Sequence, residues 1–435
     1  PSCRTRTRRL LRQRIGTWVQ CNVERRFAMT SQLSVEFKGL CGILKVDRLE
    51  LNRKLLGLNM VFKNPKVMVI YGTRPEAIKL APVIRRLKSY DDIDVAVVST
   101  GQHEELLAPI VERFGIQADH QLPPMPAGRA LNTLLSATIN GIDSIYAAAE
   151  PDVVLVQGDT TTAFAAALAA FNRGVSVTHL EAGLRTGDIR APFPEEANRR
   201  LISQITDLHC APSADAAQNL LSEGVSKERV VITGNTVIDA LHEVAEWHPE
   251  FEDPRIQDLI EGQSRFVLVT AHRRENLDKL GQIASAIEEL AGSFPDVQFV
   301  IPLHANPRVK GAFEESLAET SNVLLIEALP YAEFTALLRH SWLVITDSGG
   351  VQEEAPALGI PVLLMREKTE RHEVLQTGAV RLVGTDTERI VDAVSRLLNN
   401  DEERKAMAIV SSPYGEGRAS YRVADALHDL LLNNC

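Results

Sequence analysis

Short apolar runs rich in β-branched residues alternate with longer segments of helical periodicity from Lys66 to the C-terminus. This alternation predicts parallel strands joined by crossover helices. A first series of predicted strands covers residues 66–71, 95–99, 153–157, 175–180, 208–211 and 230–233. A second series covers residues 266–270, 297–302, 323–326, 342–346 and 362–365.

Helical periodicity fills the intervals between these strands. The clearest predicted helices cover residues 76–88, 160–172, 281–291, 332–339 and 351–358. Strands and helices in this order predict an α/β protein with two Rossmann-like, doubly wound domains. Ligands of such sheets bind beyond the carboxyl ends of the strands, so we expect a cleft between the two domains.

The boundary between the domains is predicted within residues 234–254, where a helical segment ends in the polar, proline-containing sequence HPEFEDP. We assign residues 60–235 to an N-terminal Rossmann-like domain and residues 236–417 to a C-terminal Rossmann-like domain. Residues 418–435 are expected to form a C-terminal helix that returns to the N-terminal domain.

Residues 1–59 form an atypical basic extension that opens PSCRTRTRRLLRQRIG and lacks clear apolar periodicity. An Arg-rich, acid-poor opening is typical of organelle transit peptides, but translated sequence upstream of a start at Met60 or Met29 has the same composition. A nucleic-acid-binding arm is a third interpretation, although the basic run has no interleaved aromatic residues. We favour upstream sequence and assign no catalytic residue to this segment.

The rest of the chain is acidic. The full 435 residues contain 47 Lys and Arg against 57 Asp and Glu, which gives a net charge of −10. Because residues 1–65 hold 14 basic and 4 acidic residues, the remainder has 33 against 53, or about −20. Such a charge repels a phosphate backbone, which argues against broad nucleic-acid binding but allows a local basic pocket for a small phosphorylated ligand.

Other classes of protein lose support from what the sequence lacks. No apolar run approaches the roughly 18 residues of a membrane-spanning helix. The five cysteines form no CxxC pair, which argues against a zinc site or a disulfide framework and fits the cytoplasm. The sequences GxGxxG and GxxxxGK[ST] are absent, which argues against nicotinamide-dinucleotide and P-loop nucleotide binding. HExxH and GxSxG are also absent, which argues against metal-dependent proteolysis and serine-esterase chemistry, and we expect no cofactor and no metal.

The first candidate site is an anion-binding turn directly after the strand VMVIY. Gly72 permits a tight turn, and Pro75 suits the first turn of a helix. Backbone amides at this helix start, together with Arg74 and Lys79, would bind a diphosphate. The alternative is a plain strand–turn–helix unit with solvated cations.

Three acidic positions follow strands or open a helix in the same half of the chain. Asp159 ends the sequence VVLVQGD, Glu181 follows VSVTHL, and Glu195 stands in PFPEEANRR. Asp159 has a structural alternative as a helix cap, and Glu195 or Glu196 has one at a helix start, where acids favour the dipole. Arg199 lies four residues after Glu195, where it would pair with that carboxylate or reach a phosphate.

The second half offers a histidine beside cations and a glycine turn. His272 lies between a strand and two arginines in TAHRREN, where imidazole can supply a proton and cations can stabilise a leaving phosphate; a basic surface turn is the alternative. His304 is a weaker case of the same kind. In DSGGVQEEAP, amides and a hydroxyl suit a phosphate, and Glu353 or Glu354 would accept two ribose hydroxyls.

The motifs GTRPEAIK, TGQH, QGDTTT, HLEAGLRTGD, PFPEEANRR, ITGNTVIDA, TAHRREN and TDSGGVQEEAPALGIPVL stand in this order from about Met60 onward. Together they closely resemble the non-hydrolysing UDP-N-acetylglucosamine 2-epimerases. The resemblance implies two Rossmann-like domains in the glycosyltransferase-B arrangement. It also implies interconversion of UDP-N-acetylglucosamine and UDP-N-acetylmannosamine for bacterial surface polysaccharides, without a cofactor, through elimination of UDP to a glycal and its re-addition.

Residue roles follow from the same resemblance. The carboxylates near the sugar would be Asp159, Glu181 and Glu195, with His272 as the acid or leaving-group stabiliser. Phosphate and ribose contacts would come from Arg74, Lys79, Arg199, the amides of Ser348, Gly349 and Gly350, Glu354 and Arg371. Members of the family commonly form homodimers, and many bind a second UDP-N-acetylglucosamine as an activator through residues that match Gln102 and His103.

Two features depart from the family pattern. His372 stands where a proline commonly follows Thr-Glu-Arg, and the extension of residues 1–59 has no counterpart. Three other functions remain to be weighed: a hydrolysing relative that adds water in place of UDP, a glycosyltransferase of the same architecture, and a catalytically silent UDP-sugar sensor. The gathered acids and His272 argue against the last two.

Overall fold

A computed structural model describes residues 63–102, 104–124, 130–369, 371–408 and 412–433. The basic extension of residues 1–59 and the predicted site residue His103 lie outside these ranges. Residues Pro65–His428 form one compact unit, which contains both sheets and all of the other predicted site residues.

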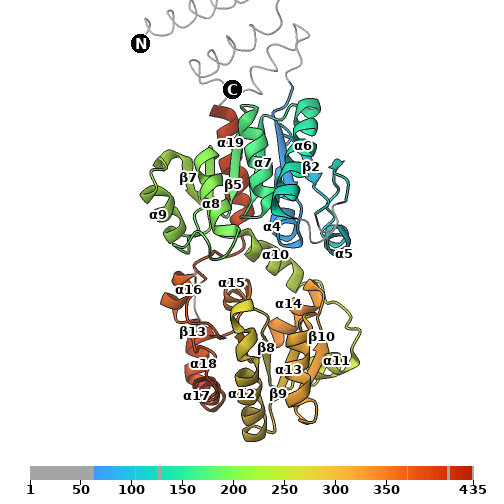
Figure 1. Cartoon of the computed structure of the whole chain (residues 1–435), viewed down its shortest axis with the longest axis vertical. Helices are drawn as coiled ribbons and strands as arrows, with labels where there is room; N and C mark the ends of the chain where they lie inside the picture. Colours follow the sequence, from blue (N-terminus) through green and yellow to red (C-terminus); the bar gives the residue numbers. More distant parts are fainter. Residues whose placement is uncertain (1–62, 103, 125–129, 370, 409–411, 434–435) are drawn as a thin grey trace, which may run out of the picture. The chain divides into compact units, whose positions relative to one another are not determined.

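The first half of this unit forms a parallel sheet with strand order β3-β2-β1-β4-β5-β6-β7 (Figure 1). Its strands are β1 (Lys66–Tyr71), β2 (Asp94–Ser99), β3 (His120–Gln121), β4 (Val153–Gln157), β5 (Ser176–Leu180), β6 (Leu208–Ala211) and β7 (Val230–Ile232). The helices of this half are α4 (Arg74–Leu87), α5 (Glu104–Arg113), α6 (Leu131–Ala149), α7 (Thr161–Asn172), α8 (Glu195–Ile205), α9 (Ala214–Ser222), the short η2 (Lys227–Arg229) and α10 (Thr236–Ala245).

A second parallel sheet follows, with strand order β10-β9-β8-β11-β12-β13. Its strands are β8 (Phe266–Thr270), β9 (Gln298–Leu303), β10 (Val323–Glu327), β11 (Leu343–Thr346), β12 (Val362–Leu364) and β13 (Val380–Leu382). The helices are α11 (Pro254–Glu261), η3 (Arg274–Lys279), α12 (Leu280–Ser293), α13 (Pro307–Leu317), α14 (Tyr331–His340), α15 (Val351–Ala357), α16 (His372–Thr377), α17 (Thr387–Asn399), α18 (Asp401–Ala408) and α19 (Ala419–Asn433).

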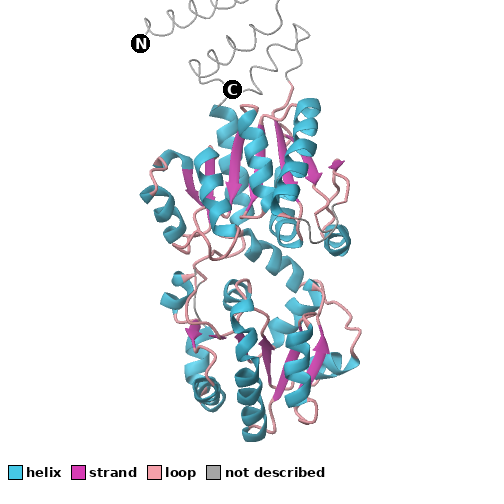
Figure 2. Ribbon diagram, in the orientation of Figure 1, coloured by secondary structure: helices cyan, strands magenta, loops and turns pink. Residues whose placement is uncertain are grey.

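Helices cover both faces of each sheet (Figure 2). In β8, Val267 and Val269 join one apolar core with α12, α13 and α17, whereas Phe266 and Leu268 join a second core with α11, α14 and α15. Strands that are buried on both faces need apolar residues at successive positions, which is why β8 reads FVLVT without alternation. The two predicted Rossmann-like domains are therefore confirmed.

Every predicted strand forms, with its ends within one or two residues of the prediction, but β3 and β13 were not predicted. Strand β3 has two residues and pairs with β2 at only two positions. In β13 only Val380 is fully buried. Strands this short leave no periodic signal, and their pairing with a longer neighbour defines them.

Each sheet has a crevice at its topological switch point. Strand β1 lies between β2 and β4, and β8 lies between β9 and β11, so the connections on the two sides of β1 and β8 leave in opposite directions. Ligands of doubly wound sheets bind at this point, beyond the carboxyl ends of the strands. The ends of β1 and β8 are therefore where functional side chains should gather.

Helix α10 follows the first sheet and packs against α4 of the first domain as well as α14 and α15 of the second. The start of α19 contacts the first domain, since Arg422 donates to the Thr233 carbonyl at 3.1 Å and His428 lies 3.0 Å from the Asp92 carboxylate. The domain limits set from the sequence, including the assignment of residues 418–435, stay predictions.

Candidate active site

A cavity of about 420 Å³ lies between the start of α4 and the loops that follow β8, β9, β10 and β11. Apolar side chains line part of it, including Ile78, Leu329 and Phe334. The polar part of the lining contains most of the residues that the sequence singled out in the second domain and the α4 turn: Arg74, Lys79, His272, His304, Ser348, Gly350, Glu353, Glu354 and Arg371. Motifs almost 300 residues apart therefore border one cavity.

The turn before α4 is built around a buried carboxylate. Glu76 accepts hydrogen bonds from the backbone nitrogens of Gly72 (3.0 Å) and Thr73 (2.7 Å) and from the Thr160 hydroxyl (2.6 Å). This capping box fixes the helix start, and it leaves the side chains of Arg74 and Lys79 to line the cavity.

The glycine turn after β11 lies beneath two guanidinium groups. A Cβ atom on Gly349 would lie 2.8 Å from the Arg273 Nη2 and 3.2 Å from the Arg371 Nη1. A side chain at this position would displace the Arg273 guanidinium from the backbone. One predicted phosphate donor is already engaged, because the Ser348 amide donates to the Thr346 hydroxyl at 2.9 Å.

His272 is held by the buried carboxylate of Asp347. The Asp347 oxygens accept hydrogen bonds from the backbone nitrogens of His272 and Arg273 and from the Asn276 amide, at 3.0 to 3.1 Å. The imidazole Nδ1 lies 3.5 Å from Asp347 Oδ1, and the ring stacks on His304 with centroids 5.5 Å apart. Burial lowers the pKa of His272, while the Asp347 charge opposes this shift.

Lys79 reaches Glu181 from the cavity wall. Its ammonium donates to both carboxylate oxygens, at 2.8 and 2.6 Å. Amides of Gln157 and Asn235 also donate to Glu181. Although burial acts to raise the pKa of Glu181, the charges of Lys79, Arg371 and Arg199 bring it below its ordinary value.

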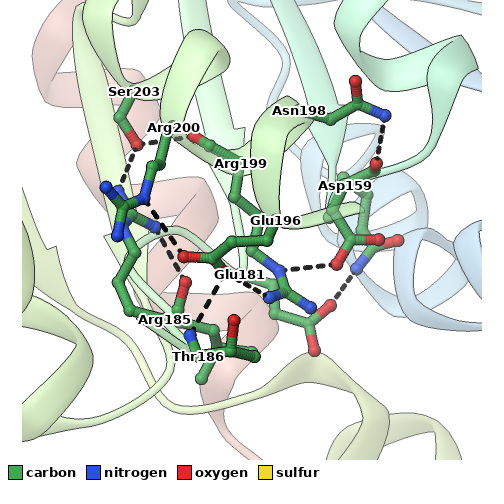
Figure 3. A network of polar contacts seen from close by, with 12 residues as sticks. Asp159, Glu181, Arg185, Thr186, Glu196, Asn198, Arg199, Arg200 and Ser203 are labelled. Atoms are coloured by element: carbon green, nitrogen blue, oxygen red, sulfur yellow. Dashed lines mark hydrogen bonds and ion pairs between the residues drawn. The ribbon is translucent and has the colours of Figure 1, made fainter. Parts of the chain in front are cut away.

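Arg199 lies between two carboxylates, as Figure 3 shows. It donates to Asp159 at 2.7 Å and to the fully buried Glu196 at 2.8 Å. The sequence suggested a pair between Arg199 and Glu195, and that interpretation is wrong. Helix α8 begins at Glu195, so its first turn turns Glu196 inward instead, toward Arg199 and the Thr186 amide.

Glu195 itself is half-buried at the helix start. No hydrogen bond or ion pair joins its carboxylate to another residue within the described ranges. Asp159 does not cap α7, because Thr160 does so by accepting from the Ala163 amide at 3.0 Å. The Asp159 carboxylate therefore serves the network around Arg199.

Asp159 and Glu181 come together because their strands are neighbours. Gln157, at the end of β4, pairs with Leu180, at the end of β5. Glu181 adopts a left-handed φ of 64°, and a Cβ atom on Gly158 would lie 3.6 Å from its Oε2. A non-glycine residue in this conformation is uncommon and is typical of functional sites. Four of the predicted site residues do not belong to the described lining of the cavity: Asp159, Glu181, Glu195 and Arg199.

Two adjacent carboxylates occupy the start of α15. Glu353 accepts from Arg371 and, at 2.6 Å, from the Asn235 amide. Glu354 lines the cavity and accepts from the Tyr331 hydroxyl at 3.4 Å. Burial, followed by the charge of Glu353, raises the pKa of Glu354 to about 7.

Gln102 contacts the first turn of α7. Its carbonyl oxygen accepts from the Thr162 hydroxyl at 2.6 Å, and it does not belong to the described lining of the cavity. The described ranges contain no group of three or more His, Cys, Asp or Glu side chains that could hold a metal ion. Within the same ranges, no helix is long and apolar enough to cross a membrane.

Several site residues were not assigned from the sequence: Arg273, Asp347, Asn235, Glu196 and Tyr331. All but Tyr331 stand within the quoted motifs, and Asp347 directly follows the buried strand β11. The signal that could have identified Asp347 is its position at a strand end, which was the reason for choosing Asp159. Tyr331 opens α14 without any motif, so only the folded cavity identifies it.

Comparisons with known proteins find relatives over most of the chain. A family model described as UDP-N-acetylglucosamine 2-epimerase matches residues 85–428. The UDP-N-acetylglucosamine 2-epimerase of Escherichia coli K12 is 44% identical over 368 residues, which is 83% of this chain and 98% of that protein.

Solved structures give the same result. The UDP-GlcNAc 2-epimerase from Neisseria meningitidis, solved bound to UDP-GlcNAc, has a TM-score of 0.77 and 42% identity over 84% of this chain and all of that one. The glycotransferase of kitacinnamycin has a TM-score of 0.58 over 85% of this chain and all of that one; at 15% identity it shows the fold alone. The expected α/β class with two Rossmann-like domains in the glycosyltransferase-B arrangement is thus confirmed.

Proposed function

The chain belongs to the UDP-N-acetylglucosamine 2-epimerase family, and from this premise we propose that it interconverts UDP-N-acetylglucosamine and UDP-N-acetylmannosamine without hydrolysis. The observation that carries the proposal is one cavity lined by His272, by phosphate-binding groups and by Lys79, which also holds the carboxylate of Glu181. This set joins groups for binding a nucleotide to groups for moving a proton.

The nucleotide would occupy the cavity. Leu329 and Phe334 offer apolar surface for the uracil ring, and the Glu354 carboxylate would accept the two ribose hydroxyls. Arg74, Lys79 and Arg371, with the Ser348 hydroxyl and the amides of Gly349 and Gly350, would bind the diphosphate. Arg273 joins this set, because its guanidinium lies over Gly349.

The reaction would begin with an elimination. A carboxylate takes the proton from carbon 2 of the sugar, the electron pair of that bond forms the double bond between carbons 1 and 2, and UDP departs with the electron pair of the carbon 1–oxygen bond. The proton on carbon 2 is not acidified by a carbonyl group, so departure of UDP must assist its removal. Cations and His272 therefore have to stabilise the departing phosphate as the base acts.

Re-addition completes the exchange. A second group delivers a proton to carbon 2 of the glycal from the opposite face, and UDP returns to carbon 1. Asp159 and Glu181 follow neighbouring strands, and Glu195 opens α8, whose Arg199 contacts Asp159, so we expect the base and the acid among these three carboxylates. Arg199 would orient Asp159 within this cluster and would add positive potential for the diphosphate.

The remaining parts of the proposal come from the family. We propose a cytoplasmic homodimer that supplies surface-polysaccharide synthesis and binds a second UDP-N-acetylglucosamine as an activator near Gln102 and His103. A hydrolysing enzyme would add water where UDP returns, a transferase would pass the sugar to an acceptor, and a sensor would change nothing. The cluster of carboxylates beside the cavity favours the epimerase over the last two.

Product analysis tests the proposal. On incubation with UDP-N-acetylglucosamine, proton NMR should reveal UDP-N-acetylmannosamine at a constant total of UDP-sugars. Asp159→Asn and His272→Ala should each lose turnover by about 10² to 10⁴-fold while UDP binding largely survives, because neither group is proposed to grip the nucleotide. Free N-acetylmannosamine with UDP would indicate the hydrolysing reaction, and an unchanged substrate would refute epimerisation.

A further inference from the structure

The single ammonium group of Lys79 can interact either with Glu181 or with the diphosphate of a bound substrate. Its side chain lines the cavity that would hold the diphosphate, and it is 17% exposed. The same ammonium donates to both oxygens of Glu181, whose side chain is 7% exposed and lies outside the described cavity lining. Lys79 therefore stands between the cavity and the carboxylate.

A carboxylate held in this way is a poor base. Both of its oxygens are engaged by a cation, and the amides of Gln157 and Asn235 donate to it as well. A base that removes a proton from carbon needs an available lone pair and a pKa near the working pH. In this arrangement Glu181 meets neither requirement.

The charged groups around Glu181 come from four elements or loops. Lys79 of α4, Arg371 before α16 and Arg199 of α8 lower its pKa, and Glu353 of α15 is the facing carboxylate. Of the three cations, Lys79 acts most strongly on Glu181, and its direct bonds add to that effect. Withdrawing Lys79 would leave burial and the Glu353 charge to raise the pKa of Glu181.

We propose that the diphosphate of the substrate takes Lys79 from Glu181, and that this exchange of partners converts Glu181 into the base. The inference rests on the proposed function and deepens it. The diphosphate carries more negative charge than one carboxylate and enters the cavity that Lys79 lines, so it competes for the ammonium. Lys79 has a flexible stem, which lets its head turn toward the phosphate.

The exchange also suits the chemistry that follows. When Glu181 accepts the proton from carbon 2, it becomes neutral and no longer attracts Lys79. The ammonium is then free to stabilise UDP as negative charge develops on the leaving oxygen. Proton removal and departure of the nucleotide thereby reinforce each other through one lysine.

Affinity for UDP tests this coupling. Glu181→Gln removes the charge that competes for Lys79, so it should bind UDP about tenfold more tightly than the wild-type protein while turnover is lost. Lys79→Met should weaken UDP binding, and adding Glu181→Gln to Lys79→Met should then change the affinity little, since the shared cation is gone. Asp143→Asn is the control for removal of one negative charge, because Asp143 pairs with Arg173 at an exposed position outside the cavity lining, and its UDP affinity should equal that of wild type.

A second measurement does not depend on Glu181 variants folding. In Lys79→Met the acidic limb of the pH profile of kcat/KM should move to higher pH, because that limb reports the base in the free enzyme. Equal UDP affinities for wild type and Glu181→Gln, or an unmoved acidic limb in Lys79→Met, would overturn the partner exchange alone. Failure of the wild-type protein to bind UDP would overturn the proposed function together with it.

Discussion

The imidazole Nδ1 of His272 lies 3.5 Å from the Oδ1 of Asp347, a carboxylate that is fully buried and also accepts the backbone nitrogen of His272. One residue thus fixes both the backbone and the ring of the candidate acid. Burial lowers the pKa of His272, and the Asp347 charge acts against it. Asp347 is therefore expected to keep the imidazole protonated at a higher pH than burial alone would allow.

Replacing Asp347 with asparagine should reduce the fraction of His272 that is protonated at neutral pH. Loss of the negative charge lowers the pKa of His272, so the basic limb of the kcat profile should move to lower pH by about one unit. Steady-state kinetics across pH measure this shift. Asp278→Asn is the control, since Asp278 is 90% exposed and pairs with Arg308, and it should leave the profile unchanged. An unmoved basic limb in Asp347→Asn would show that Asp347 does not control the protonation of His272.

Nucleotide binding should depend on the ionisation of Glu354. Its pKa is raised to about 7, and the ionised carboxylate is the better acceptor for ribose hydroxyls. From about pH 6 to about pH 8 the ionised fraction rises roughly tenfold, so the Kd for uridine should fall by a similar factor. Uridine carries no phosphate, which keeps phosphate ionisation out of the titration. In Glu354→Gln the Kd should be independent of pH over this range, and an equal slope in both proteins would exclude Glu354.

Two glycines after Glu181 provide a matched pair for stability. Both have left-handed φ values, 93° at Gly183 and 84° at Gly187. A Cβ atom on Gly183 would lie 2.1 Å from the Ala216 carbonyl oxygen, whereas nothing lies within 4 Å of one on Gly187. Gly187→Ala should cost about 1 to 2 kcal/mol through backbone strain. Gly183→Ala should cost about 1 to 3 kcal/mol more through overpacking, so its Tm should be the lower of the two.

Equal Tm values for these two variants would contradict the close approach of Ala216. The loop that carries Glu181 would then be less tightly fixed than the structure indicates.

A pair of buried histidines should make the first domain sensitive to acid. His179 and His209 are partners in register on β5 and β6 and are fully buried. Burial lowers the pKa of His209 to about 3 and that of His179 to about 4. The unfolded chain therefore binds protons at higher pH than the folded one. Stability is complete above about pH 6.5 and falls as the pH is lowered toward those folded-state values.

For His209 this amounts to about 2 kcal/mol lost between pH 7 and pH 5. Denaturant unfolding at the two pH values measures it, and His209→Leu should lose correspondingly less stability than the wild type. His340→Gln, at an exposed position, is the control and should behave as wild type does. A variant His209→Leu with the full acid sensitivity would assign the effect to other groups.

The fold was largely predictable because strands buried on both faces have unmistakable sequences. The runs FVLVT of β8 and VVLVQ of β4 can be recognised as strands from their consecutive apolar residues. The two-residue β3 has no such pattern and exists through its pairing with β2. Local sequence therefore predicted the strands that form the core. It did not predict the short strands, which depend on pairing with a longer neighbour.

The positions of Asp159, Glu181 and His272 after buried strands were predictable for the same reason, and their catalytic roles stay predictions. Their ion-pair partners were not predictable from the sequence. Lys79 and Glu181 are 102 positions apart, and Asp159 and Arg199 are 40 apart. The sequence predicted Glu195 as a local partner of Arg199. In the structure α8 is oriented so that Arg199 pairs with Glu196 instead. Long-range ion pairs depend on how elements pack, which no local pattern contains.

The central claim is that departure of UDP and removal of the hydrogen on carbon 2 are one coordinated event. Incubation of UDP-N-acetylglucosamine with the protein in deuterium oxide tests it most directly, with carbon 2 followed by proton NMR and mass spectrometry. We expect deuterium at carbon 2 of both epimers in the wild-type reaction, and incorporation about 10² to 10⁴-fold slower with Asp159→Asn or His272→Ala. Formation of UDP-N-acetylmannosamine that retains the original hydrogen at carbon 2 would contradict the account.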